Sequence, residues 1–278
     1  MRIVVTAGYN KSLHSIATMH KLIKDGHEVI GCIQVKEFQL SRVKLYLRQY
    51  GWKTFKAKFL TYLLINDNTY LSDETKAIKD YAKKIGISEY KTISSYCSDK
   101  NIKHIKVKSL NSKDAINFNE NNDVDLLIYS GGGILRKKII ESTNKGVINP
   151  HSGFLPLFRG MNVIEWSLIY GFIPYTTIHF INTGIDTGKI LLREKLNYNK
   201  NIYAYRGSAT VHNIELLSKV INDFNKYNEK AIIQKKSEGK QFFIMHKYLK
   251  DILIKYIDKN DMAHLKENYN DWSVSNFK

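Results

Sequence analysis

Three side chains on two loop-like stretches are of the types needed to move an acyl group onto an amine. Asn149 and His151 lie within residues 146–160, and Asp186 lies within residues 183–188. Acyl transfer requires a hydrogen-bond donor for the carbonyl oxygen as it gains charge, and a base for the proton of the attacking amine. An amide, an imidazole and a carboxylate together supply both.

The motif Asn149-Pro150-His151 follows an expected strand at residues 146–149. Ligands of open α/β sheets bind beyond the carboxyl ends of the strands. Residues i and i+2 of an extended chain face the same side, and Pro150 restricts the backbone between them. The two side chains could therefore face one reacting centre, although an isolated Asn-x-His is more often a turn whose histidine bonds to the backbone.

Two glycine-containing turns are further candidates for contact with a ligand. Asp186 stands between Gly184 and Gly188, in a sequence that also forms ordinary Asx turns readily. Ser130-Gly-Gly-Gly133 follows a buried strand pattern and could cradle a phosphate, let the backbone pass close to a flat ligand, or form a plain turn. It lacks the spacing of a dinucleotide fingerprint and the lysine of a P-loop.

Strand-like and helical patterns alternate along the chain, which predicts an α/β fold with a mostly parallel sheet flanked by helices. We expect strands at residues 2–6, 27–35, 102–107, 123–129, 146–149, 175–181 and 190–195. We expect helices at residues 13–24, 75–85, 114–121, 134–142, 162–170 and 204–227.

The last part of the chain predicts a small hairpin and helix extension. Two short strands are expected at residues 231–234 and 241–244, around the turn Ser237-Glu-Gly239, and a helix at residues 248–256. We therefore divide the chain into a catalytic domain of residues 1–200 and an extension of residues 201–278.

A basic segment at about residues 36–65 interrupts the α/β pattern, and its spacing of apolar residues predicts two short amphipathic helices. Its cations are Lys36, Arg42, Lys44, Arg48, Lys53, Lys56 and Lys58. Such helices can lie on an anionic membrane or bind nucleic acid. A helical flap with its lysines in water is the commoner arrangement.

The composition sets the broad class of the protein. The chain has 278 residues, 43% of them hydrophobic, and a formal charge of +17. This charge is compatible with an anionic partner or substrate, but Lys is abundant throughout and most of the charge needs no specific partner. The two cysteines form no metal or disulfide pattern, and neither a signal peptide nor a membrane-spanning run is visible, so we expect a cytoplasmic protein.

The order of these motifs resembles the formyltransferase family that uses 10-formyltetrahydrofolate. The resemblance rests on the glycine-rich strand end, then Asn149-Pro-His-Ser-Gly-Phe-Leu-Pro156, Phe158-Arg-Gly160 and Gly184-Ile-Asp-Thr-Gly-Lys-Ile190. It is strong over residues 146–194, weaker but in register over residues 1–35 and 123–145, and faint elsewhere. This chain departs from the family pattern at Pro150 and at Ser152-Gly153, which could alter the stiffness of the loop.

The resemblance implies a Rossmann-like sheet in which Asn149, His151 and Asp186 are the catalytic trio. Asn149 and a protonated His151 would stabilise the oxyanion, and Asp186 would orient His151 and help to move the amine proton. The folate pocket would be bounded by Gly133, Ile134, Leu135, Asn182 and Gly184. The resemblance implies no metal.

The family leaves three acceptors open, namely an amino sugar linked to a nucleotide, methionyl-tRNA and glycinamide ribonucleotide. The segment Gln241-Phe-Phe-Ile-Met-His246 with Tyr248-Leu-Lys250 looks like the C-terminal part of the sugar enzymes, which make formamido sugars for surface polysaccharide such as lipopolysaccharide. The basic 36–65 insertion would then allow a weak contact with a membrane surface.

If the acceptor is an amino sugar linked to a nucleotide, we expect three residues to lie near this substrate. These residues are Lys11, Arg159 and Trp166, although a tryptophan in the expected 162–170 helix is more often a core aromatic. We expect a homodimer and no nucleic-acid partner. An inactive formyltransferase fold that binds membrane or nucleic acid through its basic surface is the alternative of another class.

Overall fold

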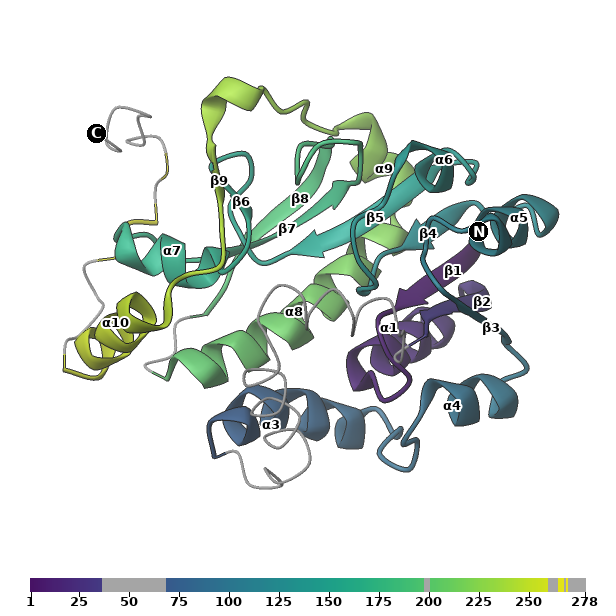
Figure 1. Cartoon of the computed structure of the whole chain (residues 1–278), viewed down its shortest axis with the longest axis horizontal. Helices are drawn as coiled ribbons and strands as arrows, with labels where there is room; N and C mark the ends of the chain where they lie inside the picture. Colours follow the sequence, from purple (N-terminus) through teal and green to yellow (C-terminus); the bar gives the residue numbers. More distant parts are fainter. Residues whose placement is uncertain (37–68, 198–200, 260–264, 268, 270–278) are drawn as a thin grey trace, which may run out of the picture.

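The computed structural model describes residues 1–36, 69–197, 201–259, 265–267 and 269 (Figure 1). The strands of its larger sheet are β1 (Arg2–Ala7), β2 (Glu28–Val35), β3 (Lys103–Val107), β4 (Leu126–Ile128), β5 (Gly146–His151), β7 (Tyr175–Phe180) and β8 (Ile190–Lys195). Its helices are α1 (Leu13–Lys24), α3 (Thr69–Lys84), α4 (Ile93–Asp99), α5 (Lys113–Asn121), α6 (Lys137–Ile140), α7 (Val163–Ile169), α8 (Ile202–Asn222), α9 (Phe224–Glu229) and α10 (Lys247–Lys259).

These strands form one sheet in the order β3-β2-β1-β4-β5-β7-β8. Neighbouring strands are parallel from β3 to β5, whereas β7 pairs antiparallel with both β5 and β8. The predicted α/β class with a mostly parallel sheet is therefore confirmed. The strand order reverses between β1 and β4, and the carboxyl ends of strands beside such a reversal are where α/β sheets bind ligands.

Both faces of the central strands are buried, which explains their continuous apolar sequences. Ile3 and Val5 of β1 pack on one face with side chains of α1, α3, α4 and α8. Val4 points to the other face, where it meets α5 and α6. In Figure 1 the helices of the first group lie together below the sheet, with α8 running along it.

Local sequence signals begin and end the first helix as expected. The Ser12 hydroxyl accepts a hydrogen bond from the Ser15 N–H at 3.2 Å, which caps the start of α1. Gly26 follows the last turn with a φ of +87°, a conformation that glycine adopts without strain. These signals are local, so the strand–helix–strand unit at the start of the chain is predictable from sequence.

The hairpin predicted for the extension is wrong, because its two strands pair with other parts of the chain. The second strand, β9 (Lys240–Phe242), pairs in parallel with β6 (Phe158–Gly160), a short strand that sequence patterns did not predict. In the expected first strand, Ile232 makes an isolated bridge to Ile190 of β8. The 3-10 turn Lys236–Glu238 separates the two segments.

Close approach of two backbones explains why the chain turns towards β6. A Cβ atom at Gly239 would lie 2.0 Å from the Pro156 carbonyl oxygen, so a side chain there would block the contact. The Met161 N–H donates to the Phe242 carbonyl at 3.0 Å and extends the pairing. The extension is therefore built onto the loop after β5.

Other elements differ from the sequence predictions in smaller ways. The helix expected at residues 204–227 is divided into α8 and α9 at Asp223, where Asn222-Asp223 disfavours a helix interior. Helix α4 was not predicted, although Thr92 caps it by accepting from the Ser95 N–H. The basic insertion predicted at residues 36–65 lies outside the described residues from residue 37 onwards.

Helix α8 belongs to the main core, since Leu217 and Val220 pack in the same cluster as Ile3. The division of the chain at residue 200 stays a prediction, and the packing of α8 favours a boundary after α9. Among the helices of the described part, none is long and apolar enough to cross a bilayer.

Candidate active site

Asn149 and His151 lie on β5 itself, because this strand continues to His151 rather than ending at residue 149. In the pairing with the antiparallel strand β7, Asn149 stands opposite His179 and His151 stands opposite Thr177. The alternation of side chains along β5 therefore points Asn149 and His151 to the same face, as the sequence predicted.

His179 holds the Asn149 amide in one orientation. The His179 Nδ1 lies 2.8 Å from the Phe180 carbonyl oxygen, which can only accept, so Nδ1 carries the proton. Burial lowers the pKa of His179 to about 4, with the charge of Asp186 opposing this shift, so the ring is neutral at pH 7 and its Nε2 accepts. The Asn149 Nδ2, 3.1 Å away, must donate to it, which leaves the second N–H of the amide for another acceptor.

His151 is oriented by a backbone carbonyl. Its Nε2 donates to the Phe158 carbonyl oxygen at 2.8 Å, so the neutral ring keeps its lone pair on Nδ1. This arrangement requires Gly153, because a Cβ atom there would lie 2.8 Å from His151 Nε2 and 2.7 Å from the Phe158 oxygen. The glycine that departs from the family pattern is thus the residue that makes room for the ring.

Asp186 faces His151 without a hydrogen bond between them. Its Oδ2 lies 3.7 Å from His151 Nδ1, and its Oδ1 lies 3.6 Å from His179 Nε2. Both distances exceed the hydrogen-bond range. In this structure the Phe158 carbonyl, rather than Asp186, orients the His151 ring through a hydrogen bond. Asp186 interacts with the ring electrostatically, at 3.7 Å.

Two donors fix Asp186 from either side. The Gly160 N–H donates to its Oδ2 at 2.8 Å, and the Gln234 Nε2 donates to its carbonyl oxygen at 3.0 Å and to that of Gly188 at 2.5 Å. The φ of Asp186 is +51°, a left-handed conformation that aspartate tolerates better than most residues but that still costs free energy. Gln234 comes from the extension, so residues far along the chain hold this strained loop.

The electrostatics of the cluster keep Asp186 ionised. Burial alone would raise the pKa of its carboxyl group. Electrostatic interactions with His151, His179 and Arg159, together with the hydrogen bond from the Gly160 N–H, outweigh burial and lower that pKa.

The glycine-rich turn after β4 lies on the same side of the sheet. Tyr129 donates to the Gly133 carbonyl at 3.1 Å, and its pKa is raised by burial and by the charge of Asp186. Asn111 Nδ2 donates to the Ile134 carbonyl at 2.8 Å, while the Ile134 side chain is 78% exposed. Leu135 instead packs into the core.

The loop that carries Asp186 is an Asx turn, and the side chain that closes this turn is Asn182 rather than Asp186. The Asn182 Oδ1 accepts from the Gly184 N–H at 3.0 Å and from the Thr187 hydroxyl at 2.7 Å. This bonding leaves the carboxylate of Asp186 available to the site. Ile185, beside Asp186, is 43% exposed.

The three residues predicted to contact substrate lie in different places. Arg159 is buried beside Asp186 and donates to the Gly239 carbonyl at 2.7 Å. Trp166 belongs to an aromatic cluster with Phe242, and its Nε1 donates to the Phe243 carbonyl at 3.0 Å. Lys11 is exposed just before α1, where it lines a cavity.

Sequence reasoning missed His179 and Gln234. His179 is a single polar residue between Ile178 and Phe180, and Gln234 stands where a short apolar run gives way to lysines, so each is a weak signal alone. His179 becomes informative through its position opposite Asn149, and that register depends on the antiparallel turn of β7. In the described part of the chain, no group of three or more His, Cys, Asp or Glu side chains could hold a metal ion.

Two methionyl-tRNA formyltransferases illustrate the relatives of this sequence. The one from Clostridium tetani is 29% identical over 207 residues, which cover 71% of this chain and 64% of that protein. The one from Thermodesulfovibrio yellowstonii is 35% identical over 124 residues, covering 44% of this chain and 37% of that protein. The chain thus spans less than two thirds of the length of either relative.

Solved structures with low sequence identity share the fold. A sugar N-formyltransferase from Shewanella has a TM-score of 0.51 and 14% identity, covering 92% of this chain and 87% of that one. An N-formyltransferase from Helicobacter canadensis, solved with folinic acid and dTDP-3-aminofucose, has a TM-score of 0.51 and 15% identity, covering 89% and 74%. A glycinamide ribonucleotide transformylase from Symbiobacterium toebii has a TM-score of 0.50 and 15% identity, covering 85% and 92%.

A family model matches residues 65–214, more than half of the 278 residues, and this region contains Asn149, His151, His179 and Asp186. The match includes the strands β5 and β7 and the loop that carries the carboxylate. The chain belongs to the formyl transferase family.

Proposed function

We propose that Asn149, His151 and Asp186 transfer the formyl group of 10-formyltetrahydrofolate to a primary amine. The observation that carries this proposal is the juxtaposition of an oriented amide, an imidazole with an available Nδ1 and a half-buried carboxylate 3.7 Å from that nitrogen. When bound, the folate would supply a formyl carbonyl attached to a nitrogen that can leave.

Asn149 stabilises the oxygen of the reacting carbonyl. Its amide is held by His179, so the second N–H points in a fixed direction and needs no reorganisation as charge develops. One donor of this kind contributes about 3 kcal/mol to transition-state stabilisation.

His151 moves the proton of the amine. As the amine nitrogen bonds to the formyl carbon, Nδ1 of His151 accepts a proton from it, and the Asp186 carboxylate stabilises the resulting imidazolium. The same proton then passes to the leaving nitrogen as its bond to the formyl carbon breaks. The products are a formamide and the folate with an N–H, so atoms and charge balance.

The loops around the trio fit a folate. Exposed Ile134 and Ile185 supply apolar surface on the two turns, as a flat pterin ring requires. Gly133 has a φ of +103° and no atom within 4 Å of an added Cβ, so its backbone is accessible. Gly133, Ile134, Asn182 and Gly184 would hold the cosubstrate, with Leu135 supporting the turn from the core.

The acceptor we propose is an amino sugar linked to a nucleotide, as the resemblance of residues 241–250 suggests. The names of the sequence relatives favour methionyl-tRNA as the second candidate. With an amino sugar as acceptor, the protein we propose is a cytoplasmic homodimer that makes formamido sugars for surface polysaccharide.

The test is a comparison of acceptors with the purified full chain. Nucleotide-linked amino sugars, methionyl-tRNA and glycinamide ribonucleotide are each incubated with 10-formyltetrahydrofolate, and the formamide is detected by mass spectrometry. We expect a product with at least one amino sugar and none with an Asp186→Asn variant. Formylation of methionyl-tRNA alone would refute the proposed acceptor, and formylation of no amine would refute the proposed reaction.

A further inference from the structure

A cavity of about 1090 Å³ lies among α1, α3 and α8 and is strongly basic. Five lysines line it, and Asp80 is the one acidic side chain among the lining residues that the structure describes. The lysines are Lys11, Lys76, Lys79, Lys83 and Lys91. Such a concentration of one charge in a concave surface attracts and retains anions.

Three of these lysines are presented by one helix. Lys76, Lys79 and Lys83 recur along α3 at spacings of three and four residues, which puts them on one side of the helix. All three side chains are exposed, and none forms an ion pair with a carboxylate of the described residues. Tyr81, on another side of α3, anchors the helix in the core.

The inner wall of the cavity is polar and neutral. His14 lines it, and burial lowers the pKa of His14 to about 4, so this ring adds no charge. Its Nδ1 is 2.9 Å from the Ser130 hydroxyl, which lies 2.8 Å from the Ser15 hydroxyl. These groups tie the wall of the cavity to the glycine-rich turn of the active site.

The cavity also reaches the catalytic strand. Asn213 of α8 lines it, and its Nδ2 donates at 3.1 Å to the hydroxyl of Ser152, the residue after His151. Ser152 faces the side of the sheet opposite to His151, so an acceptor bound among the lysines would reach His151 around the carboxyl edge of the sheet, where Tyr9 and Lys11 also line the cavity. The exposed ring of Tyr9, which also lines the cavity, offers a surface for a base to stack on.

We infer that this cavity binds the diphosphate of a nucleotide-linked acceptor, with Lys76, Lys79 and Lys83 as its main cationic contacts. Lysine is a common point-charge partner of phosphate. The inference rests on the proposed function and deepens it, because it assigns the nucleotide part of the acceptor to this cavity. The two phosphate groups of a diphosphate offer several anionic oxygens, so more than one lysine can contact it at once.

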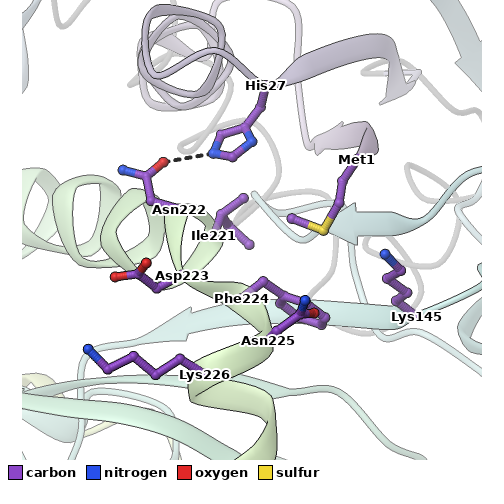
Figure 2. Close-up of a pocket in the computed structure, with 9 residues that line it drawn as sticks. All are labelled: Met1, His27, Lys145, Ile221, Asn222, Asp223, Phe224, Asn225 and Lys226. Carbon is purple, nitrogen blue, oxygen red and sulfur yellow. Dashed lines mark hydrogen bonds between the residues drawn. The ribbon is translucent and has the colours of Figure 1, made fainter.

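The binding test uses nucleoside diphosphates and needs no reaction. Isothermal titration with UDP and dTDP is performed on the full chain and on the variant Lys76→Gln/Lys79→Gln/Lys83→Gln. The matched control is Lys138→Gln/Lys145→Gln/Lys226→Gln, which removes the same charge from exposed positions outside the cavity; Lys145 and Lys226 line the smaller cavity of Figure 2. We expect the cavity variant to weaken binding about tenfold or more and the control less than about twofold.

Three outcomes would overturn the inference. Equal loss of affinity in both variants would mean that net charge alone attracts the nucleotide. If the wild type binds no nucleoside diphosphate, the cavity is not a diphosphate site. Tight binding of transfer RNA, lost in the cavity variant and unmatched by nucleoside diphosphates, would assign the lysines to nucleic acid.

A kinetic arm separates this inference from the proposed reaction. The cavity variant should raise KM for a nucleotide-linked amino sugar about tenfold while kcat changes less than about twofold, because the lysines do not touch the reacting atoms. If nucleotide binding is lost as expected but the wild type formylates no amine, the proposed reaction fails and the cavity assignment stands. If formylation proceeds with an unchanged KM, the cavity assignment fails and the reaction stands.

Discussion

The two ends of the central sheet differ in what their polar groups do. At the carboxyl end, Asn149, His151, His179 and Asp186 are drawn together from β5, β7 and the loop after it, and Asp186 stays charged although mostly buried. At the other end, a cavity of about 520 Å³ is lined by Met1, Lys145 and the end of α8. Figure 2 shows His27 bonded there to Asn222, at 2.7 Å, with the lysines spread around the rim.

The strength of the interactions between charged and polar groups therefore depends on where in the fold these groups lie. In the amino-end cavity, Lys145 lies 3.8 Å from Asp125 at the surface, where such pairs contribute little. In the carboxyl-end cluster, removal from water makes each charge and each oriented N–H act more strongly on its neighbours. We therefore expect substitutions to affect activity at one end and hardly at all at the other.

The largest effect is expected at Asn149. Asn149→Ala removes the donor aimed at the carbonyl oxygen and should lower kcat by a few hundredfold, equivalent to about 3 kcal/mol. The circular dichroism spectrum and melting temperature should stay close to those of the wild type, since Asn149 is partly exposed. A kcat within tenfold of the wild type would remove Asn149 from the mechanism.

His179 is expected to act through Asn149 as a positioning residue. His179→Leu leaves the amide without its acceptor and should lower kcat roughly tenfold or more with little change in KM. His179→Gln can still accept through its side-chain oxygen and should recover part of the rate. Equal rates in the two variants would show that acceptance from Asn149 does not matter.

The same histidine predicts a dependence of stability on pH. Its folded pKa of about 4 lies below the value of about 6.5 expected when unfolded, so the unfolded state binds more protons between these limits. The stability contributed by neutral His179 is therefore complete above pH 6.5 and is lost as the pH falls towards 4. Between pH 7 and 5 the wild type should lose about 2 kcal/mol more unfolding free energy than His179→Gln.

Urea unfolding at the two pH values measures this difference. His14 has a similarly lowered pKa, so the wild type and the variant share that part of the slope. Parallel losses in both proteins would contradict the buried, neutral state of His179.

Gln234 should show that the extension supports the site. Gln234→Leu removes the donor to the carbonyl oxygens of Asp186 and Gly188, which should cost about 1 to 2 kcal/mol of unfolding free energy and lower kcat several-fold. Gln241→Leu, at an exposed position of β9, is the matched control and should change neither. Identical behaviour of the two variants would separate the extension from catalysis.

The smallest effect is expected at the amino end. Lys145→Gln/Lys226→Gln should leave kcat and KM within about twofold of the wild type, because exposed charges far from the reacting atoms are screened by salt. Initial rates at two salt concentrations would check this. A large loss at low salt would mean that this end also takes part in acceptor binding.

The sequence is sufficient to predict the elements whose signals are local. The buried run of β1, the Ser12 cap of α1 and the order of strands and helices all follow from neighbouring residues. The chemistry of Asn149, His151 and Asp186 makes them candidates from sequence, and the resemblance to the formyltransferase family is what implies that they act together. The local signals by themselves predict the fold class.

The remaining features depend on contacts between distant residues. The β6–β9 pairing joins residues about eighty positions apart, and no local pattern distinguishes it from a hairpin between residues 231–234 and 241–244. The same holds for His179, whose function follows from its register opposite Asn149. The orientation of His151 by the Phe158 carbonyl likewise requires the loop after β5 to fold back over Gly153.

Single-turnover transfer of labelled formyl groups from 10-formyltetrahydrofolate tests the central claim most directly. The wild type, Asn149→Ala, His151→Ala and the double variant are compared with the best acceptor found. If the amide and the imidazole act together on one reacting carbonyl, the double variant should be only slightly slower than the slower single variant, with each single loss a hundredfold or so. Near-normal transfer by the double variant would show that the reaction occurs elsewhere in the protein.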